Sequence, residues 1–229
     1  MKKSIIILAL CCFSGCSTPI RQMLSPCVRI TKPGSDMVGS GVVVHKRSMG
    51  RQSAVIVLTN YHIAAAIGRR PFVRFYRYDR RGVITESINL EGRIAAHDSA
   101  TDTALIVVKI PPGWGIPASI IKKSDTTVGD RLLSVSCPGG VPPIMHEGIM
   151  SGFYRASVIS IRMGIYTGGL CKGSSGGGIY NEKGDLVGIV SRIPHIKTVD
   201  GHVAATNHHT VLFVPITKEM LVNLSGVSI

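Results

Sequence analysis

KGSSGGG, residues 172–178, places Ser175 inside a glycine-rich turn. Glycine adopts backbone conformations that other residues avoid, so such a turn can aim several backbone N–H groups at one point. A serine hydroxyl becomes a useful nucleophile only beside a base and a site that binds the developing negative charge. The segment therefore predicts Ser175 as a nucleophile. It also predicts an oxyanion hole in the loop of Gly173, Ser174 and Ser175, with the N–H groups of Gly173 and Ser175 as the expected donors. A plain Gly/Ser surface loop is the alternative at this point.

A histidine and an aspartate precede this turn in the chain order His, Asp, Ser. His62 ends the hydrophobic run of residues 54–61, and Asp102 opens the run of residues 103–110. A histidine held at a barrel edge can act as the base, and a carboxylate at the mouth of a strand can accept its N–H and fix the tautomer. Taken alone, His62 is better interpreted as a core histidine. Asp102 taken alone could be an aspartate in a turn, and Asp98 is then the rival candidate for the residue that orients the histidine. Together with Ser175 they predict acyl-transfer chemistry.

The rest of the chain predicts an all-β fold. Valine and isoleucine are common, aromatic residues are few, and 26 glycines separate short apolar runs. A Pro-Pro-Gly break at residues 111–113 divides the runs into two sets of roughly six, which predicts two six-stranded β-barrels side by side. The expected strands are residues 42–44, 54–58, 72–76, 88–94 and 104–110, and then 116–121, 131–136, 144–151, 157–161, 178–180, 186–192 and 211–215. Barrel one then spans about residues 28–112 and barrel two about 113–215, and a short helix over 215–223, capped by Thr217, follows.

The first 16 residues predict export and are not expected to belong to the fold. Two lysines precede an apolar stretch at residues 5–13 that is too short to span a bilayer. FSGC, residues 13–16, resembles a bacterial lipobox, in which cleavage leaves a lipid-modified Cys16 at the periplasmic face of the outer membrane if the host is Gram-negative. An ordinary secretory peptide cut nearby is the alternative, and either one exports the protein. Residues 17–27 are then a tether, and residues 28–229 form the folded domain.

The charge of the chain is strongly basic. Its formal net charge of +13 predicts attraction to anionic surfaces, and for an exported protein anionic lipid is a nearer partner than nucleic acid. Residues 69–81 hold six arginines and four aromatic residues. This segment is interpreted as a hairpin with arginines in water and aromatics inside, in preference to a surface for nucleic acid. A lipid-tethered protein could still lay this face against anionic lipid.

Cysteines and histidines offer few further sites. Cys27, Cys137 and Cys171 remain in an oxidising compartment, where disulfides are allowed, and an odd number leaves at least one unpaired. The histidines at positions 195, 202, 208 and 209 cluster in what reads as a hairpin loop, but they lack the fixed spacing and the carboxylate or thiolate company of a zinc site. No metal and no cofactor is expected.

Several segments, taken in chain order, resemble HtrA-type trypsin-like serine proteases. The resemblance covers about residues 28–220 and implies a chymotrypsin-like double barrel with peptidase activity. It implies His62 as the base, Asp102 and not Asp98 as the residue that orients it, and Ser175 as the nucleophile. The matching segments are GSGVVV at 39–44, VLTNYH at 57–62, HDSATDTALI at 97–106, GDRLLSV at 129–135, HEGIMSG at 146–152, GSSGG at 173–177 and GDLVGIVS at 184–191.

The resemblance also implies a specificity pocket and a tentative disulfide. Gly169 would lie at the base of the S1 pocket, with Ile189, Val190 and Ser191 as its wall, which implies small or medium apolar P1 residues in protein or peptide substrates. Cys137 and Cys171 would flank the active-site wall and form the tentative pair, with two buried free thiols as the alternative.

Two features of the sequence depart from the usual pattern of the family. Ser174 stands where the family usually has asparagine, and no PDZ-sized segment follows within these residues. Relatives are commonly trimers, so an oligomer is compatible with the sequence. The competing interpretation is a catalytically silent protein of the same fold, which binds membrane or protein partners through its basic face.

Overall fold

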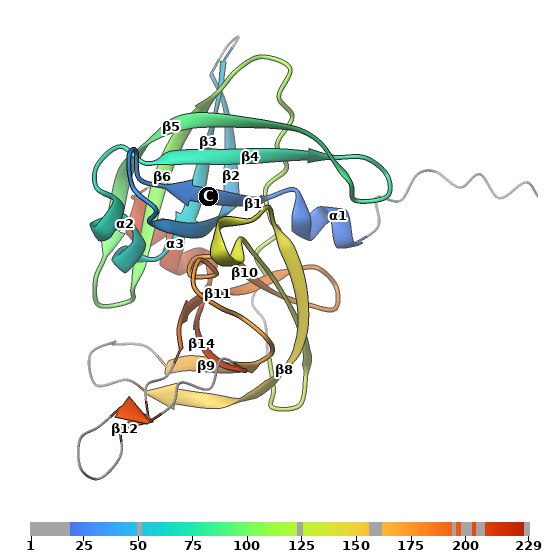
Figure 1. The fold of residues 1–229 in the computed structure, drawn as a ribbon, viewed down its shortest axis with the longest axis vertical. Helices are drawn as coiled ribbons and strands as arrows, with labels where there is room; N and C mark the ends of the chain where they lie inside the picture. Colours follow the sequence, from blue (N-terminus) through green and yellow to red (C-terminus); the bar gives the residue numbers. More distant parts are fainter. Residues whose placement is uncertain are drawn as a thin grey trace, which may run out of the picture.

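The computed structural model describes residues 19–49, 52–122, 126–155, 162–193, 196–197, 203–204 and 209–226. They form two closed six-stranded antiparallel barrels, one above the other in Figure 1. The first has the strand order β1-β2-β3-β6-β5-β4 and the second β10-β11-β14-β9-β8-β7. The predicted all-β double barrel is confirmed.

The barrel strands follow the chain in two blocks. Barrel one contains β1 (Cys27–Thr31), β2 (Val38–Met49), β3 (Gln52–Thr59), β4 (Phe72–Tyr78), β5 (Ile84–Asp98) and β6 (Thr103–Ile110). Barrel two contains β7 (Arg131–Ser136), β8 (Ile144–Arg155), β9 (Arg162–Thr167), β10 (Gly178–Asn181), β11 (Leu186–Arg192) and β14 (Thr210–Pro215). The short pair β12 (Ile196–Lys197) and β13 (Val203–Ala204) stands apart, and the expected hairpin loop with the histidines at 195, 202 and 208 lies outside the described residues.

Apolar side chains form three clusters, because each barrel has an interior and the two barrels share a face. One cluster fills barrel one and a second fills barrel two. The third draws on both barrels and therefore lies between them; its members include Leu58, Leu105, Val135, Ile189 and Leu212. Burial of this shared face holds the barrels together and fixes the groups that meet across it.

The connection between the barrels corrects one predicted strand. Residues 116–121 form no strand, and Ile121 makes only an isolated parallel bridge to Leu186 of β11. Ser119 N–H donates to Val43 O at 2.8 Å and Leu186 N–H to Ile120 O at 2.7 Å, so the segment contacts both barrels in turn. Its backbone therefore serves as a strap across the junction. The strand expected over 157–161 lies outside the described residues.

The N-terminal segment is more ordered than a tether. Residues Pro19–Leu24 form helix α1, and Met23 and Leu24 are buried in the cluster between the barrels. The predicted tether is wrong over this part, because it supplies two apolar side chains that the junction buries. The predicted signal segment and Cys16 lie outside the described residues. Among the described residues, no helix is both long and apolar enough to cross a bilayer.

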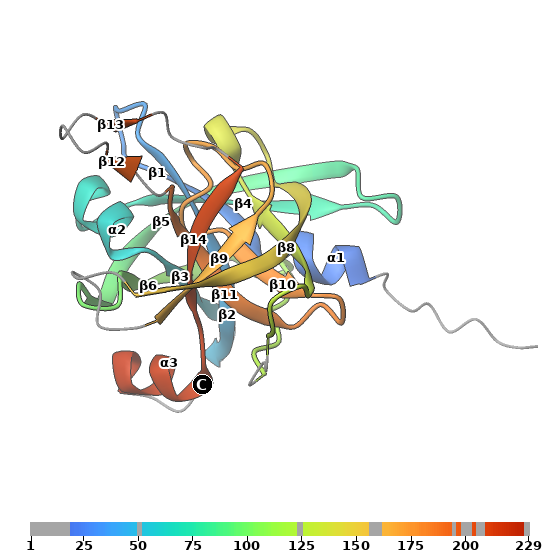
Figure 2. The same ribbon diagram turned by 90° about the horizontal axis from the view of Figure 1, so that it is seen from below.

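The C-terminal helix agrees with its prediction. Helix α3 spans Lys218–Ser225, and Thr217 Oγ accepts a hydrogen bond from Met220 N at 3.2 Å as the expected cap. Leu221 is fully buried in the cluster between the barrels. In Figure 2 this helix stands at one side of the molecule, next to the end of the chain.

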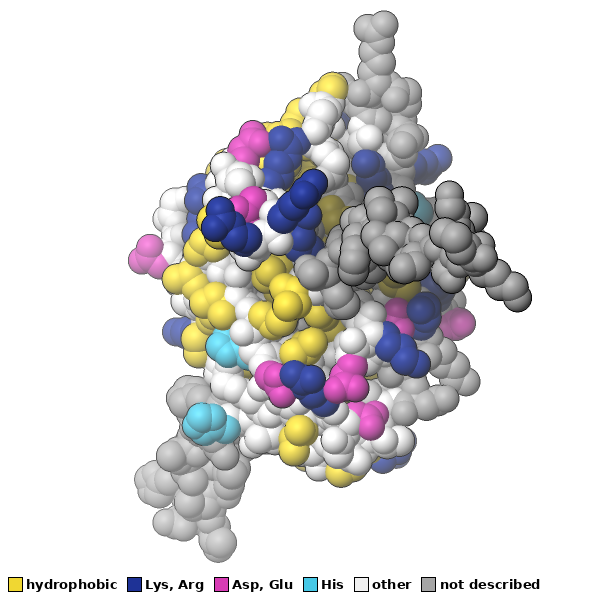
Figure 3. Space-filling view, turned by 90° about the vertical axis from the view of Figure 1, so that its right-hand side faces the viewer, with side chains coloured by type: hydrophobic (Ala, Val, Ile, Leu, Met, Phe, Trp, Pro, Cys, Tyr) yellow, Lys and Arg dark blue, Asp and Glu magenta, His cyan; other side chains and the backbone are white. Residues whose placement is uncertain are grey.

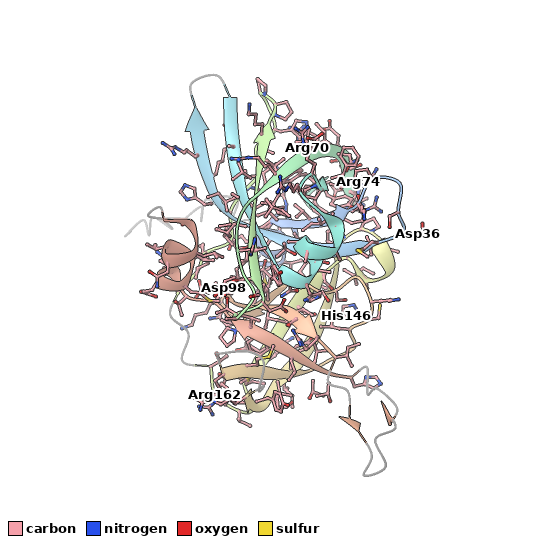
Figure 4. All side chains as sticks on the ribbon, turned by 90° about the vertical axis from the view of Figure 1, so that its left-hand side faces the viewer. Asp36, Arg70, Arg74, Asp98, His146 and Arg162 are labelled. Atoms are coloured by element: carbon pink, nitrogen blue, oxygen red, sulfur yellow. The ribbon has the colours of Figure 1, made fainter. Side chains whose placement is uncertain are left out.

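The basic segment of residues 69–81 is a hairpin strand, as interpreted. Phe75, Tyr76 and Tyr78 of β4 are buried, while its arginines reach the surface. Arg77 pairs with Glu86 at 2.6 Å and lies over the ring of Trp114. Figure 3, which views the end of the molecule that carries α1, shows acidic and basic side chains side by side there. Figure 4 likewise shows labelled arginines on both barrels, so the positive charge is spread over the molecule.

All three described cysteines are free, so the tentative Cys137–Cys171 disulfide is wrong. Cys27 and Cys137 are fully buried in the cluster between the barrels, whereas Cys171 is exposed. The alternative, in which both members of the pair are buried free thiols, holds for Cys137 but not for Cys171. Burial raises the pKa of the Cys27 thiol well above its ordinary value, and the neighbouring Cys137 adds to the rise.

Native protein treated with a maleimide should therefore be modified at Cys171 and spared at Cys27 and Cys137. The thiolate is the reactive form; burial withholds access to the other two thiols, and it also raises the pKa of Cys27. Peptide mass spectrometry before and after denaturation would locate the adducts. Rapid native labelling of Cys137 would contradict the buried position.

Candidate active site

His62 lies in the first turn of helix α2 (Tyr61–Ile67), directly after β3. The prediction placed it at a strand end and missed the helix. Asn60 has an extended backbone at the helix start, and its side-chain amide donates to Asp102 O at 3.1 Å instead of capping the helix. This bond ties the segment that carries His62 to the turn that carries Asp102.

Asp102 meets His62 through both its carboxylate oxygens. The imidazole Nδ1 lies 3.0 Å from each oxygen, and His62 N–H donates to Oδ1 at 3.1 Å. Asp102 is buried and has a left-handed backbone with φ of 53° in the turn between β5 and β6. Asp98 instead caps this turn, accepting from Ala100 N–H at 2.8 Å. In Figure 4 the label of Asp98 lies near the junction of the barrels.

The surroundings of Asp102 keep its carboxyl ionised. Burial pushes its pKa upward and is the largest single influence, but hydrogen bonds and charge from His62 and the Ser191 hydroxyl together outweigh it, so the pKa is lowered. Ser191 Oγ donates to Oδ2 at 2.6 Å, and Arg192 Nη2 lies 3.5 Å from the same oxygen. An ionised carboxylate accepts the Nδ1 proton of His62, which leaves Nε2 to act as the base.

Ser175 comes from barrel two, in the loop between β9 and β10. Its hydroxyl donates to Ser191 O at 3.1 Å. Ser175 and His62 line the same cavity, of about 420 Å³, at the junction of the barrels. The structure thus brings together the three residues predicted from the sequence: His62 and Asp102 from barrel one and Ser175 from barrel two.

The loop that carries Ser175 has two N–H groups without an acceptor in the part of the chain that the structure describes. Neither Gly173 N–H nor Ser175 N–H bonds to any residue that the structure describes, whereas Ser174 N–H donates to Cys171 O at 3.0 Å. Ser174 is therefore not an oxyanion donor, although its loop was expected to supply the hole. Gly139 N–H donates to Lys172 O at 2.6 Å. Because C=O and N–H of a trans peptide point in opposite directions, this bond turns the Gly173 N–H away from Gly139.

Gly173 has to be glycine at this place. Its φ is +93°, and a Cβ there would stand 2.7 Å from Cys137 O and 2.9 Å from Gly139 N. Both the conformation and the space exclude a side chain. The close approach of the Gly173 backbone to residues 137–139 is what shapes the loop.

Ser40 of barrel one holds the same loop by its backbone and its side chain. Ser40 N–H donates to Ser175 O at 2.7 Å, and Ser40 Oγ donates to Gly173 O at 2.7 Å. The hydroxyl also accepts from Cys137 N–H at 2.8 Å, and Thr59 Oγ1 donates to Ser40 O at 2.7 Å. Ser40 is fully buried. Residue 40 was placed in a family segment but was given no role, because the partners of its hydroxyl lie more than 90 residues away.

Replacing Ser40 by alanine should lower kcat by about tenfold to a hundredfold, with KM changed less than about threefold, because the loop loses its anchor. Unfolding should become easier by about 1–3 kcal/mol, since the buried Cys137 N–H loses its acceptor. Steady-state kinetics and urea unfolding measure the two effects.

Ser136→Ala is the matched control for that change, because its hydroxyl is also buried but has no described partner. Its effect should stay below about 1 kcal/mol and leave kcat within about twofold. Equal kinetic losses in the two variants would contradict a role for the Ser40 hydroxyl in holding the loop.

The predicted specificity residues divide into two groups. Val190 and Ser191 line the cavity, because a β-bulge between Val190 and Arg192 interrupts the alternation of β11. Ile189 does not line it: its side chain is fully buried in the cluster between the barrels, so its predicted place in the pocket wall is wrong. Gly169 is exposed and is not part of the cavity lining, and a Cβ there would meet nothing within 4 Å.

Known proteins match much of this chain in sequence. The trypsin-like peptidase domain family matches residues 39–189 of the chain. Protease Do-like 8, chloroplastic, of Arabidopsis thaliana is 28% identical over 139 residues, covering 57% of this chain and 31% of that protein. A probable periplasmic serine endoprotease DegP-like of Ectopseudomonas mendocina is 31% identical over 143 residues, covering 60% of this chain and 27% of that protein. The chain thus spans about a third of the length of these curated relatives.

Solved structures share the fold. An inactive form of Rv3671c from M. tuberculosis superposes with a TM-score of 0.63 at 16% identity, covering 93% of each chain. A variant of the HtrA-type protease AlgW, solved with a tripeptide, gives a TM-score of 0.65 at 21% identity, covering 90% of this chain and 61% of that one.

Proposed function

The chain belongs to the trypsin-like peptidase domain family, and from this premise we propose that it is a serine endopeptidase with His62, Asp102 and Ser175 as its catalytic triad. The observation that carries the proposal is the pair of 3.0 Å contacts from His62 Nδ1 to Asp102, in a cavity that Ser175 shares. Ion pairs that only stabilise a surface seldom join a buried carboxylate to a histidine that shares a cavity with a partly buried serine.

In this mechanism Ser175 Oγ attacks the carbonyl carbon of the scissile peptide bond while His62 Nε2 takes the hydroxyl proton. Asp102 holds the imidazole in the required tautomer and stabilises the imidazolium that forms. The Gly173 and Ser175 N–H groups, free of described partners, would receive the oxyanion. His62 then gives its proton to the departing amine, and water hydrolyses the acyl-enzyme by the same steps in reverse roles.

The proposed P1 residue is small or medium-sized and apolar. Leu170, Val190, Ile193 and Val211 line the cavity beside Ser175, and apolar walls favour apolar side chains. The proposed P1 preference is the same as the one inferred from the sequence. It now rests on different residues, because Gly169 and Ile189 do not line the cavity.

Export is the second part of the proposal. The N-terminal pattern of residues 1–16 supports it, and a relative described as periplasmic is consistent with it. A basic membrane-binding face at residues 69–81 is left out of the proposal, because Arg70 and Arg77 pair with Glu91 and Glu86.

A fluorophosphonate probe tests the catalytic proposal directly. The wild-type protein should be labelled, and Ser175→Ala and His62→Ala should not, because the probe reports a serine activated by a base. A folded wild-type protein that resists the probe would favour the catalytically silent alternative.

A further inference from the structure

The active-site cavity combines an apolar lining with two cationic side chains. Lys172 precedes the oxyanion loop, and Arg192 ends β11; both line the cavity with His62 and Ser175. No acidic side chain of the described residues lines it. A hollow with this composition attracts negative charge to the place where a peptide would be cut.

Arg192 has hydrogen-bonding capacity left over for a substrate. Its Nη2 lies 3.5 Å from Asp102 Oδ2, but that carboxylate already accepts from His62 and, at 2.6 Å, from Ser191 Oγ. A guanidinium has five N–H donors, and Asp102 is the one partner of Arg192 among the described residues, so donors remain for a ligand. The side chain is 41% exposed, and an incoming carboxylate can reach it from solvent.

Lys172 lines the cavity as a cation that is unpaired within the described part of the chain, whereas several other surface cations are paired. Arg70, Arg77 and Arg131 each pair with a glutamate. The Lys172 ammonium has no ion-pair partner among the described residues, although its side chain is exposed. Its backbone carbonyl is fixed by Gly139 N–H at 2.6 Å, so the side chain begins from a defined point beside the nucleophile. The Lys172 ammonium is therefore unpaired among these residues, on a backbone of fixed position. It makes no described contact that stabilises the fold, and it is available to bind an anionic ligand.

We propose that Lys172 and Arg192 are specificity-determining residues that select peptide substrates carrying aspartate or glutamate next to an apolar P1 residue. This inference rests on the proposed peptidase function and adds the chemical class of its substrates. The apolar lining holds the P1 side chain, and the two cations bind carboxylates of flanking residues.

The expected selectivity is moderate and depends on salt. Partly exposed ion pairs are weak, so replacing one flanking glutamate by glutamine should lower kcat/KM about threefold to tenfold at low ionic strength. The ratio should approach one at about 0.5 M salt, because screening shortens the reach of each charge to a few ångströms.

Matched peptides test the proposal. Internally quenched peptides with alanine, valine or leucine at P1 would carry either glutamate or glutamine at the flanking positions, and the kcat/KM ratio of each pair would be measured. The variants Lys172→Glu and Arg192→Glu should each lower the glutamate-to-glutamine ratio at least threefold, and together they should invert it. The ratio is the readout because it cancels any general loss of activity.

Arg47→Glu is the control for net charge. Arg47 is exposed on β2, and no described contact of its side chain is present, so this variant removes the same charge away from the cavity. Its ratio should equal that of the wild type. A ratio near one in the wild type would overturn the proposal, as would a preference that survives in the double variant or disappears equally in Arg47→Glu.

Binding to Ser175→Ala separates this inference from the catalytic proposal. Fluorescence anisotropy of the same labelled peptides should show tighter binding of the glutamate peptides, and Arg192→Glu in this background should remove the difference. Discrimination in binding without any cleavage by the wild type would uphold the cationic site and refute the peptidase. Cleavage without discrimination between the peptides in either measurement would uphold the peptidase and refute the cationic site.

Discussion

Ser175→Ala should lower kcat for peptide cleavage by about a millionfold, because the covalent route disappears together with the nucleophile. His62→Ala should cost about as much, since the two groups act as one unit. Asp102→Asn should lower kcat by about ten-thousandfold, because an amide favours the wrong tautomer of the imidazole. Each variant should keep its fold, which circular dichroism and urea unfolding would check.

Ser174→Ala is the matched control for the nucleophile. Ser174 is next to Ser175 in the chain, but its buried hydroxyl has no described hydrogen-bond partner. Its removal should cost less than about tenfold in kcat. If Ser174→Ala were the inactive variant and Ser175→Ala the active one, the assignment of the nucleophile would be wrong.

Gly176→Ala should destabilise the protein by about 3–5 kcal/mol, the largest effect expected outside the triad. Gly176 has φ of +85°, which a side chain disfavours, and a Cβ there would collide with Ser40 O and Thr59 Oγ1. These are groups of barrel one pressed against the nucleophile loop of barrel two. Neither can move away, because Ser40 and Thr59 are fully buried and bonded to each other. Urea unfolding at neutral pH gives the free-energy difference.

Gly169→Ala provides the comparison for that substitution. Gly169 lies in the same connection between β9 and β10, but a Cβ there would meet nothing within 4 Å. Its free energy of unfolding should change by less than about 0.5 kcal/mol. Similar losses in both variants would mean that close packing against barrel one is not what Gly176 provides.

Much of the fold and site could be predicted because the signals were local. Residues 131–136 and 186–192 were predicted as strands with the same bounds as β7 and β11, since turns flank short apolar runs there. Asp102 was preferred to Asp98 by the resemblance of its segment, and the structure gives Asp98 the turn and Asp102 the histidine.

The errors concern features that depend on distant parts of the chain. Helix α2 was missed because YHIAAAI has only seven residues and directly follows a strand, although Asn60 before it is a residue type common at helix starts. Ile189 was assigned to the pocket because the bulge in β11, which decides which side chains face the cavity, leaves no mark in the sequence. The predicted Cys137–Cys171 disulfide was wrong because Cys137 is buried and Cys171 is exposed, and the spacing of the two cysteines in the sequence does not show this difference.

The sharing of the active site between the barrels makes catalysis conditional on complete folding. His62 and Asp102 belong to barrel one, Ser175 to barrel two, and Ser40 joins the two sides by bonds that exist only after the barrels dock. A chain with one barrel formed, or with both formed but apart, therefore has no working nucleophile. Incompletely folded copies therefore cannot cut other proteins under the proposed mechanism, and the ability to cut appears only with the last step of assembly.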